Sequence, residues 1–426
     1  MVWTQSVITL PLRARGFHRI TGSLGIKMKP FGVFQPTEIR FGRGRFRQLG
    51  KVAASYGRRA LLVSGPPTDS LAPTIAKGKS LLESAGLTVA HFDGVVPNPT
   101  TDSVSAAAAL ARTHQAELIV GLGGGSSLDT AKAVAVEAAH EETCWTYRLF
   151  QATPSPQTLP VIAVTTTSGT GSHVTQVAVV TNLQQRDKSY LCDPQLFPKV
   201  AIVDPDLMLT APREVTALTG WDAFTHAFEA SLHKNGSPYV RLLADEAMRL
   251  VAANLPPLLE DLGNQQRRAA LAWADTLAGL CLANAGVTLP HSMGMAISGR
   301  CPHIAHGESL ALVYPAFTRF TWAASVPQFA AAARLLNPEL IGVGDDEAAA
   351  QSCAEIDLFL QRIGLWYGLE ARGVPAAELD ALAAQSLTLP DYRNNPRVAN
   401  VEEIRAMLAD CQMRAAAAQP PTRPFT

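Results

Sequence analysis

The sequence predicts an α/β N-terminal domain with a mostly parallel sheet, followed by an all-α domain. Two observations support this division. Between residues 31 and 212, short apolar runs alternate with amphipathic stretches of helical spacing, whereas residues 213–418 contain successive helical stretches with few strand-like runs. Alternating strands and helices favour a parallel sheet with right-handed crossovers, and a series of helices without strands favours a helical domain.

Five apolar runs in the first half are interpreted as buried strands: 59–63, 88–90, 118–120, 161–164 and 200–203. Helices are expected over 74–85 and 101–114 in the first half, and over 240–255, 265–285, 325–336, 346–364, 375–387 and 401–418 in the second. Sheets of this kind bind ligands at the carboxyl ends of their strands, so binding loops are expected directly after the strands.

Both ends of the chain are left out of the two domains. Residues 1–30 are expected to be a disordered extension, and residues 419–426, QPPTRPFT, a flexible tail. The first 28 residues contain four basic residues and no acidic one, which resembles an organelle transit peptide. A disordered extension, or a start codon assigned upstream of a true beginning at Met28, is the favoured interpretation.

Charge and cysteine content exclude several classes of protein. The 36 Lys and Arg residues balance 36 Asp and Glu residues, which disfavours nucleic acid or an anionic membrane as a partner. The six cysteines are scattered singly, as in reduced proteins of a cytosol-like compartment. No apolar run approaches the roughly 20 residues needed to cross a bilayer. We therefore expect a soluble cytoplasmic protein, or an organelle-matrix protein if the basic segment is a transit peptide.

Two loops indicate a phosphorylated ligand. The apolar run 118–120 leads into GLGGGSS at 121–127 and then into a helix that contains Asp129. Glycines allow close approach of a ligand, and free amides at a helix start favour an anion. The spacing is not the G-x-G-x-x-G fingerprint, so a tight turn that merely requires glycine is the alternative. A second polar loop, TTTSGTG at 165–171, makes an extended phosphorylated ligand the better interpretation.

Histidines and a carboxylate in the second half indicate a metal site. Asp222 and His226 lie four residues apart in a helical pattern, so both project from one face. His291, His303 and His306 follow within a short segment. One carboxylate with three imidazoles suits Zn²⁺ or Fe²⁺. Separate structural roles are the alternative, which the clustering of the residues in one predicted cleft disfavours.

The order and spacing of these segments resemble the iron-containing (group III) alcohol dehydrogenase family from about Phe31 to about Cys411. The matching stretches are FGRGRFRQL, PNPT at 97–100, GGGSSLDTAK at 123–132, TTTSGTGSHVT at 165–175, AIVDPDLM at 201–208, TGWDAFTHAFEA at 219–230, HGESLALVYP at 306–315 and NNPR at 394–397.

The resemblance implies a dehydroquinate synthase-like architecture, with a dinucleotide-binding domain at 31–212 and a helical metal-binding, catalytic domain at 213–418. The implied metal ligands are Asp222, His226, His291 and His306. The implied cofactor contacts are Asn98, Gly124, Gly125, Ser126, Asp129, Thr166, Thr167, Thr175 and Lys188. The implied cofactors are NAD or NADP and one divalent ion, Fe²⁺ with Zn²⁺ as the alternative. A homodimer is expected from the resemblance to this family.

Three positions depart from the family pattern. Gly65 stands where NAD-preferring members usually place a ribose-binding aspartate, so use of NADP is also expected. Met295 replaces the second histidine of an H-x-x-x-H pattern, and His303 is our candidate for the missing catalytic residue. His173 stands where a glutamate is common, which predicts a different substrate pocket.

The sequence therefore predicts hydride transfer between nicotinamide and a small alcohol or aldehyde, hydroxy acid or semialdehyde. One alternative is transhydrogenation between a hydroxy acid and an oxo acid with retained cofactor. Another is a non-redox lyase similar to dehydroquinate synthase, but residues 219–231 and 284–308 offer only Arg300 to hold a phosphorylated substrate. A nucleotide-binding scaffold without catalysis is the third alternative.

Overall fold

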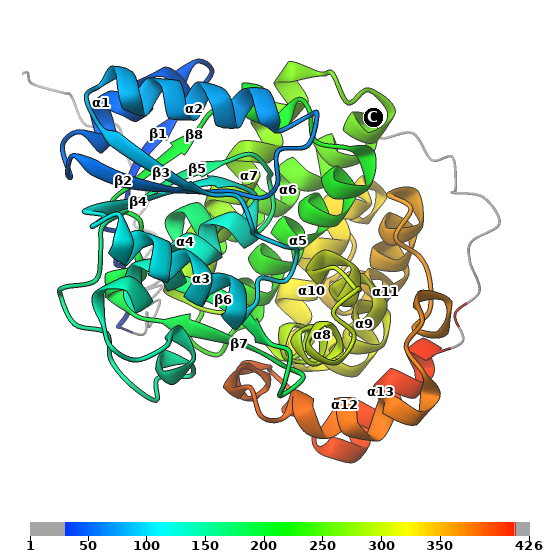
Figure 1. Cartoon of the computed structure of the whole chain (residues 1–426). Helices are drawn as coiled ribbons and strands as arrows, with labels where there is room; N and C mark the ends of the chain where they lie inside the picture. The colour runs from blue at the N-terminus through cyan, green and yellow to red at the C-terminus, as the bar shows by residue number, and fades with distance from the viewer. Residues whose placement is uncertain (1–29, 413, 415–426) are drawn as a thin grey trace, which may run out of the picture. The chain divides into compact units, whose positions relative to one another are not determined.

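The structure is a computed structural model that describes residues 30–412 and 414. From Val33 onward these residues belong to one compact unit, in which an α/β half precedes a helical half (Figure 1). Except for residue 30, the predicted N-terminal extension lies outside the described residues, as does the predicted tail at 419–426.

The α/β half is built on a six-stranded sheet in the order β1-β8-β5-β4-β2-β3, and every neighbouring pair is parallel. Its strands are β1 (Glu38–Phe41), β2 (Arg59–Val63), β3 (Thr88–Phe92), β4 (Leu118–Gly123), β5 (Val161–Thr165) and β8 (Val200–Val203). All residues of β4, β5 and β8 are buried, as expected for apolar strands covered on both faces. The predicted fold class is therefore confirmed.

Helices cover both faces of this sheet: α1 (Leu49–Ala53) and α2 (Ala72–Ser84) on one side, α3 (Thr101–Thr113) and α4 (Gly125–Ala139) on the other (Figure 1). Side chains of one strand point alternately to the two faces, so Leu61 packs with the α3 and α4 residues and Leu62 with those of α1 and α2. This double covering leaves the carboxyl ends of the strands free for binding loops.

A separate two-stranded antiparallel sheet, β6 (Val177–Asn182) and β7 (Asp187–Cys192), follows β5. The sequence interpretation did not include this hairpin, nor the short edge strand β1. The β1 segment, EIRF, is only four residues long and half of it is charged, so it lacks the apolar run that marks the central strands.

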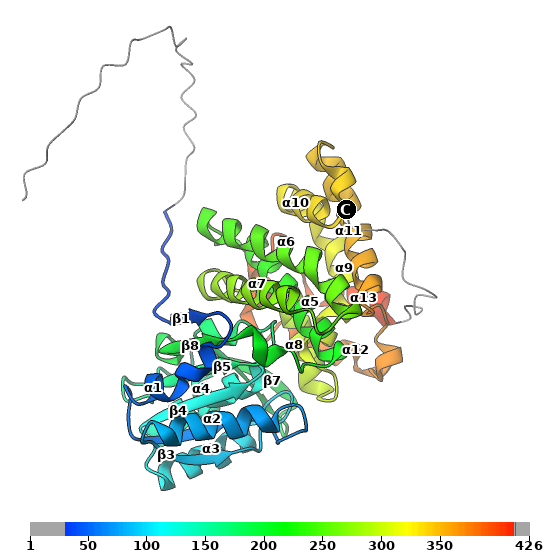
Figure 2. The ribbon, with the colours of Figure 1, turned by 90° about the horizontal axis from the view of Figure 1, so that it is seen from above.

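The helical half contains α5 (Arg213–Leu232), α6 (Pro238–Glu260), α7 (Gln265–Asn284), α8 (Leu289–Arg300), α9 (His306–Thr321), α10 (Val326–Leu336), α11 (Asp345–Arg362), α12 (Leu379–Ser386) and α13 (Val401–Gln412). Figure 2 shows these helices grouped on one side of the α/β half. Helix α5 is central and packs against α6, α7 and α9. Its Trp221 ring meets the Tyr314 ring of α9 edge-on, with centroids 4.8 Å apart.

Three helices differ by more than two residues from their predicted bounds, and one of them, α6, continues to Glu260, beyond the predicted end at 255. The segment predicted as one helix over 375–387 is a 3₁₀ turn (Ala376–Glu378) followed by α12, and α13 ends at Gln412 within the described chain. A short 3₁₀ helix, η10 (Pro390–Asn394), lies between α12 and α13 and contributes to the site below. Among residues 30–412 and 414, no single helix is long and apolar enough to cross a membrane; α7 and α8 meet that criterion only as a pair bent by 101°.

Candidate metal and nucleotide site

Three helices bring together the four residues expected to bind metal. Asp222 and His226 lie one turn apart on α5, His291 lies in the first turn of α8, and His306 begins α9. The Asp222 Oδ1 atom is 3.8 Å from His226 Nε2, 4.0 Å from His291 Nε2 and 3.7 Å from His306 Nε2. Because the four candidate ligand atoms lie within 4.8 Å of one another, they surround a common point.

The chemistry of this cluster fits a bound divalent cation. Asp222 Oδ1 and His291 Nε2 are buried and have no hydrogen-bond partner among the residues that the structure describes. Buried polar atoms without a partner are costly, and a cation would satisfy both. Burial raises the pKa of the Asp222 carboxyl to about 8 and lowers the pKa of His226 and His306 well below the usual range. The low pKa values keep His226 and His306 neutral, the form in which imidazole binds metal, whereas the raised pKa of Asp222 means that a cation must displace its proton on binding.

Glu229, one turn beyond His226 on α5, orients one of the histidines. Its Oε1 atom lies 2.8 Å from His291 Nδ1, and its Oε2 atom accepts from the Thr288 N–H at 2.9 Å. The Tyr314 hydroxyl donates to Oε1 at 3.4 Å. A carboxylate on Nδ1 fixes the tautomer with the proton there and directs the Nε2 lone pair toward the centre of the cluster. The sequence interpretation missed this role, although Glu229 lies inside the TGWDAFTHAFEA stretch.

The backbone of the second polar loop holds another ligand. His226 Nδ1 lies 3.2 Å from the Gly169 carbonyl oxygen. A Cβ atom at Gly169 would lie 2.4 Å from the Thr219 carbonyl oxygen, so only glycine allows the loop to approach α5 this closely. The loop after β5 therefore connects the sheet to the metal cluster.

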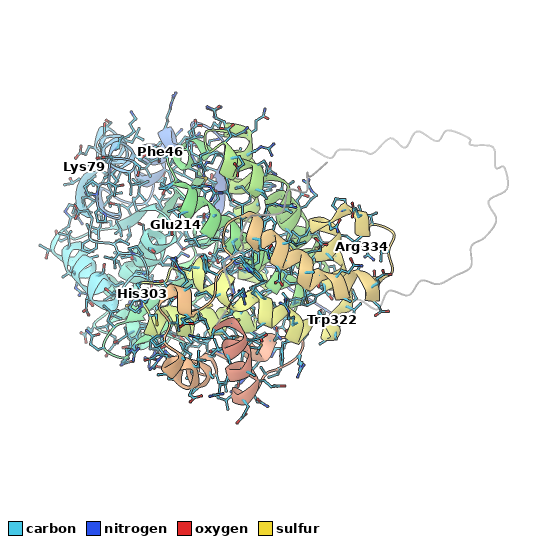
Figure 3. The ribbon with its side chains drawn as sticks, turned by 90° about the vertical axis from the view of Figure 1, so that its right-hand side faces the viewer. Phe46, Lys79, Glu214, His303, Trp322 and Arg334 are labelled. Atoms are coloured by element: carbon cyan, nitrogen blue, oxygen red, sulfur yellow. The ribbon has the colours of Figure 1, made fainter. Side chains whose placement is uncertain are left out.

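The structure does not support the catalytic role expected for His303. This side chain is exposed, in the turn between α8 and α9 (Figure 3). Its Nε2 atom lies 3.1 Å from the Arg372 carbonyl oxygen, and it does not contribute to the lining of the cavity at the metal cluster. The residue is close to the ligands in sequence, but the turn directs it to the surface. We correct that expectation.

The glycine turn after β4 has the geometry of an anion site. Gly123 has a φ of +151°, and a Cβ atom there would lie 2.4 Å from Ser127 Oγ. A Cβ atom at Gly125 would lie 2.4 Å from the Thr170 side chain, so the two polar loops pack directly against each other. No side chain caps the first turn of α4, which leaves its amides available to a phosphate group.

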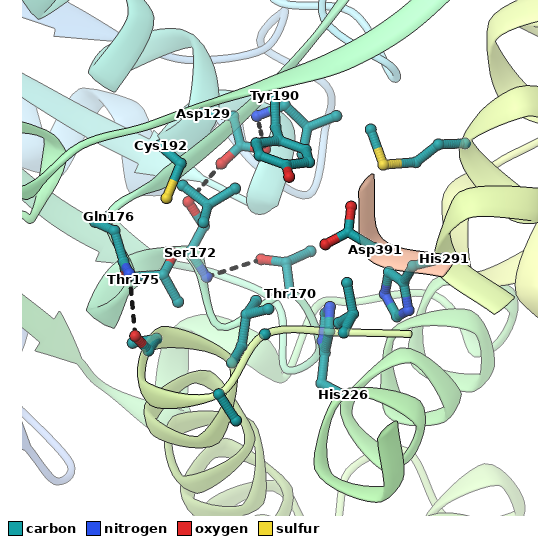
Figure 4. Close-up of a pocket in the computed structure, with 18 of the residues that line it drawn as sticks. Asp129, Thr170, Ser172, Thr175, Gln176, Tyr190, Cys192, His226, His291 and Asp391 are labelled. Atoms are coloured by element: carbon teal, nitrogen blue, oxygen red, sulfur yellow. Dashed lines mark hydrogen bonds between the residues drawn. The ribbon is translucent and has the colours of Figure 1, made fainter. Parts of the chain in front are cut away.

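A cavity of about 550 Å³ joins the two parts of the site (Figure 4). Six of the nine predicted cofactor contacts line it: Asn98, Gly125, Ser126, Asp129, Thr175 and Lys188. His226, His291 and His306 line it as well. Gly124, Thr166 and Thr167 lie beside the turn instead: the Thr166 N–H donates to the Gly123 carbonyl at 2.9 Å, and a Cβ atom at Gly124 would lie 3.1 Å from Thr167.

Two buried charged side chains of the cofactor set have partners from other elements. Lys188 of β7 donates to Asn98 Oδ1 at 2.8 Å, and burial lowers the pKa of this lysine to about 8. Asp129 of α4 accepts from Ser172 Oγ at 2.6 Å and from the Val179 N–H at 3.1 Å. These contacts fix the hairpin β6–β7 against the glycine turn and form one wall of the cavity.

The remaining departures from the family pattern lie in different places. Met295 lines the cavity, whereas His173 is fully buried and lies 3.0 Å from Thr276 Oγ1. The sequence interpretation also missed Tyr190 of β7 and Asp391 of η10, which line the cavity. Burial raises the pKa of Asp391 to about 6. Its only sequence signal is a position three residues before NNPR.

The site combines two features across one cavity: a glycine turn at the end of a parallel sheet, and a carboxylate with three imidazoles. Together they define a nucleotide- and metal-binding enzyme. Comparison with known proteins agrees. Residues 36–205 match the model of the iron-containing alcohol dehydrogenases, and residues 216–411 match that of the C-terminal part of the Fe-containing alcohol dehydrogenase family. The chain belongs to the iron-containing alcohol dehydrogenase family.

Individual relatives cover most of the chain. The 1,3-propanediol dehydrogenase of Klebsiella pneumoniae is 34% identical over 88% of this chain and 95% of its own length. The NAD-dependent methanol dehydrogenase of Bacillus methanolicus is 31% identical over 88% of this chain and 98% of its own. The crystal structure of an archaeal halo-thermophilic Red Sea brine pool alcohol dehydrogenase, ADH/D1 bound to NZQ, has a TM-score of 0.86 and 30% identity, covering 91% of this chain and all of that one.

The protein is thus an NAD(P)-dependent oxidoreductase that acts on small alcohols and aldehydes. Enzymes of this family use NAD(P) and an iron ion, and the four-residue cluster on α5, α8 and α9 offers a place for such an ion. The predicted enzyme class and cofactors are confirmed at this level.

Proposed function

We propose that Asp222, His226, His291 and His306 hold one Fe²⁺ ion, with Zn²⁺ as the alternative metal, and that the nicotinamide ring lies beside it in the cavity. The observation that supports this most strongly is the placement of Asp222 Oδ1 between 3.7 and 4.0 Å from three imidazole nitrogens. Within residues 30–412 and 414, Asp222 Oδ1 and His291 Nε2 have no hydrogen-bond partner.

The bound ion would act as a Lewis acid at the substrate oxygen, which favours loss of a hydride from the carbinol carbon and its return to a carbonyl carbon. The protein contributes by holding the nucleotide in position. Amides of the glycine turn and the start of α4 bind the pyrophosphate, and the β6–β7 hairpin, fixed through Lys188 and Asp129, supports the nicotinamide end. Apolar side chains such as Leu282 and Val287 line the cavity and exclude water from the reacting atoms.

We also propose that the site accepts NADP as well as NAD. Gly65 lies just beyond the carboxyl end of β2, where a ribose-binding carboxylate is expected, and glycine brings no negative charge to repel a 2′-phosphate. Initial rates with matched concentrations of NAD and NADP test this. A kcat/KM with NADP more than about a hundredfold below that with NAD, about 2.7 kcal/mol, would contradict it.

Cytoplasmic location and a homodimer are further proposals. All six cysteines are free and five are buried, which supports a reducing compartment. Strand β1 forms one edge of the sheet, and Val33 and Phe34 just before it are exposed, so this edge offers an unpaired surface to a second copy. Light scattering of the full chain tests the oligomer, and cell fractionation tests the location.

The proposed function is tested by elemental analysis of freshly purified protein, combined with oxidation of primary alcohols followed by NADH or NADPH absorbance. We expect about one iron per chain and net formation of reduced nucleotide. The double variant Asp222→Ala/His226→Ala should lose both metal and turnover while still binding NAD(P). Turnover that persists after the metal is removed would contradict the proposal, and hydride exchange without net nucleotide reduction would indicate a transhydrogenase.

A further inference from the structure

The cavity extends from the metal cluster toward η10, along the hairpin β6–β7 and the end of α7. Most of its wall in this direction is apolar: Val177, Val179, Leu282, Val287 and Met295. Apart from the metal cluster, the acidic side chains of the described chain that line the cavity are Asp129 and Asp391. Both oxygens of Asp129 accept hydrogen bonds from the protein, from Ser172 and from the Val179 N–H. Asp129 is thereby tied to the β6–β7 side of the site, whereas Asp391 lies on the η10 side of the cavity.

Asp391 is placed beside the reacting centre. Its side chain is 9% exposed, in the first turn of η10. Figure 4 shows its carboxylate lying between Tyr190 and His291 and pointing into the pocket. Tyr190 of β7 is its neighbour on the hairpin side and His291 its neighbour on the metal side. The backbone N–H of Asp391 also interacts with the carboxylate, and because a carboxylate offers about four acceptor sites, sites remain for a ligand in the cavity.

The basic groups of the pocket do not neutralise Asp391. Lys188 Nζ donates to Asn98. Lys234 and Arg393 are exposed at the mouth, where Lys234 Nζ lies 3.5 Å from the Arg393 carbonyl oxygen, and water screens both charges. The interior thus presents a negatively charged acceptor on an apolar wall, in the same cavity as the histidines of the metal cluster.

We propose that Asp391 is a specificity-determining residue that selects small alcohols with a second hydroxyl group, that is, diols. The inference rests on the proposed function: one hydroxyl lies at the metal cluster and the other donates a hydrogen bond to Asp391. The reaction is unchanged, since the carbinol carbon gives a hydride to NAD(P)⁺, its hydroxyl loses a proton, and a hydroxyaldehyde forms. The second hydroxyl is neither oxidised nor reduced.

This arrangement discriminates against two other substrate classes. The alkyl chain of a simple alcohol would leave the buried carboxylate without its partner, and sites built for a hydroxyl disfavour analogues that lack it. A hydroxy acid or acid semialdehyde would bring a second negative charge against Asp391. A hydrogen bond to a charged group corresponds to a preference of about 10- to 100-fold in kcat/KM.

The test compares α,ω-diols from ethanediol to 1,5-pentanediol with the primary alcohols of the same carbon number, using the metal-replete full-length enzyme. We expect the best-fitting diol to exceed its matched alcohol by at least about tenfold in kcat/KM. In Asp391→Leu this ratio should fall to about one or below, and Asp391→Asn, which keeps an acceptor oxygen, should retain part of it. Asp380→Leu, an exposed acidic residue on α12, is the matched control and should keep the wild-type ratio.

Several outcomes would overturn the inference. They are a wild-type ratio near one, a ratio that Asp391→Leu does not change, and a preference for 3-aminopropanol or 3-hydroxypropionate over 1,3-propanediol. If thermal melting shows that Asp391→Leu does not fold, the diol-to-alcohol ratios of the wild type and of Asp391→Asn still test the inference. A wrong proposed function would give a distinct result, because the wild type would then oxidise none of these diols and alcohols with either nucleotide.

Discussion

Replacing Glu229 with Gln perturbs the metal cluster without touching a ligand. The variant keeps the size and shape of the side chain, but its amide nitrogen cannot accept a hydrogen bond. Glu229 accepts at 2.8 Å from His291 Nδ1, at 2.9 Å from the Thr288 N–H and at 3.4 Å from the Tyr314 hydroxyl. The glutamine can turn its single amide oxygen toward either His291 or Thr288, and its NH2 group then faces the N–H donor of the other residue.

The expected effect has two parts. Loss of an outer partner of a metal-binding histidine lowers metal affinity by about 10- to 100-fold, or about 1.4 to 2.7 kcal/mol. The unsatisfied Thr288 donor is expected to lower the free energy of unfolding by about 1–3 kcal/mol. The affinity loss is the specific part, because a purely structural role for Glu229 predicts only the second effect.

Metal affinity is measured by competition with a chelator, and stability by denaturant unfolding of the metal-free protein. Glu137→Gln is a matched control, since Glu137 is also buried and accepts from a backbone N–H, that of Cys144 at 2.7 Å, but lies on α4. It should lower stability and leave metal affinity unchanged. Wild-type metal affinity in Glu229→Gln would refute the reasoning.

Three further predictions concern single groups of the site. Burial raises the pKa of Asp222 to about 8, so below that pH a cation must displace the carboxyl proton in order to bind. The apparent metal affinity should therefore fall by up to about tenfold per pH unit as the pH is lowered from 8. An affinity that does not change with pH in chelator titrations would contradict this. In the metal-free protein the linked stability has the opposite sign, since a carboxyl with a raised folded pKa stabilises the fold fully only below its unfolded pKa of about 3.9 and loses this contribution as pH rises toward 8. Gly125→Val should raise the dissociation constant for NAD(P)H at least about tenfold, because a Cβ atom at this position would lie 2.4 Å from the Thr170 side chain. Nucleotide binding is followed by fluorescence, and the metal content should not change. An equal loss of metal would show general misfolding instead. His303→Ala should keep kcat/KM within about twofold, because an exposed side chain outside the cavity contributes little, and a loss of a hundredfold would restore the catalytic role that its position argues against.

The central strands and most helices could be predicted because their residues are apolar at spacings that only one kind of element satisfies. Strands β2 and β8 begin and end at the residues predicted, and the metal cluster follows from Asp222 and His226 one helical turn apart together with the family resemblance. Strand β1 and the hairpin β6–β7 were missed, since a short charged edge strand and a partly polar hairpin carry no long apolar run.

The rest of the site depends on contacts between segments that are distant in sequence. His303 and His306 are three residues apart, yet one lies at the surface and the other at the cluster, because α9 begins only at His306. Asp391 reaches the cavity from η10, some 100 residues after His291, and no spacing rule connects the two. Periodicity places a residue on a face of its own helix, but not against a distant partner.

The most direct test of the account is X-ray absorption at the iron edge of freshly purified protein, together with its His291→Ala variant. We expect about one iron per chain with nitrogen and oxygen ligands and the scattering pattern of imidazole, and we expect this signal to be reduced or lost in the variant. Protein that turns over alcohols without stoichiometric metal, or iron bound by sulfur ligands and unaffected by His291→Ala, would contradict the claim that these four side chains share one cation.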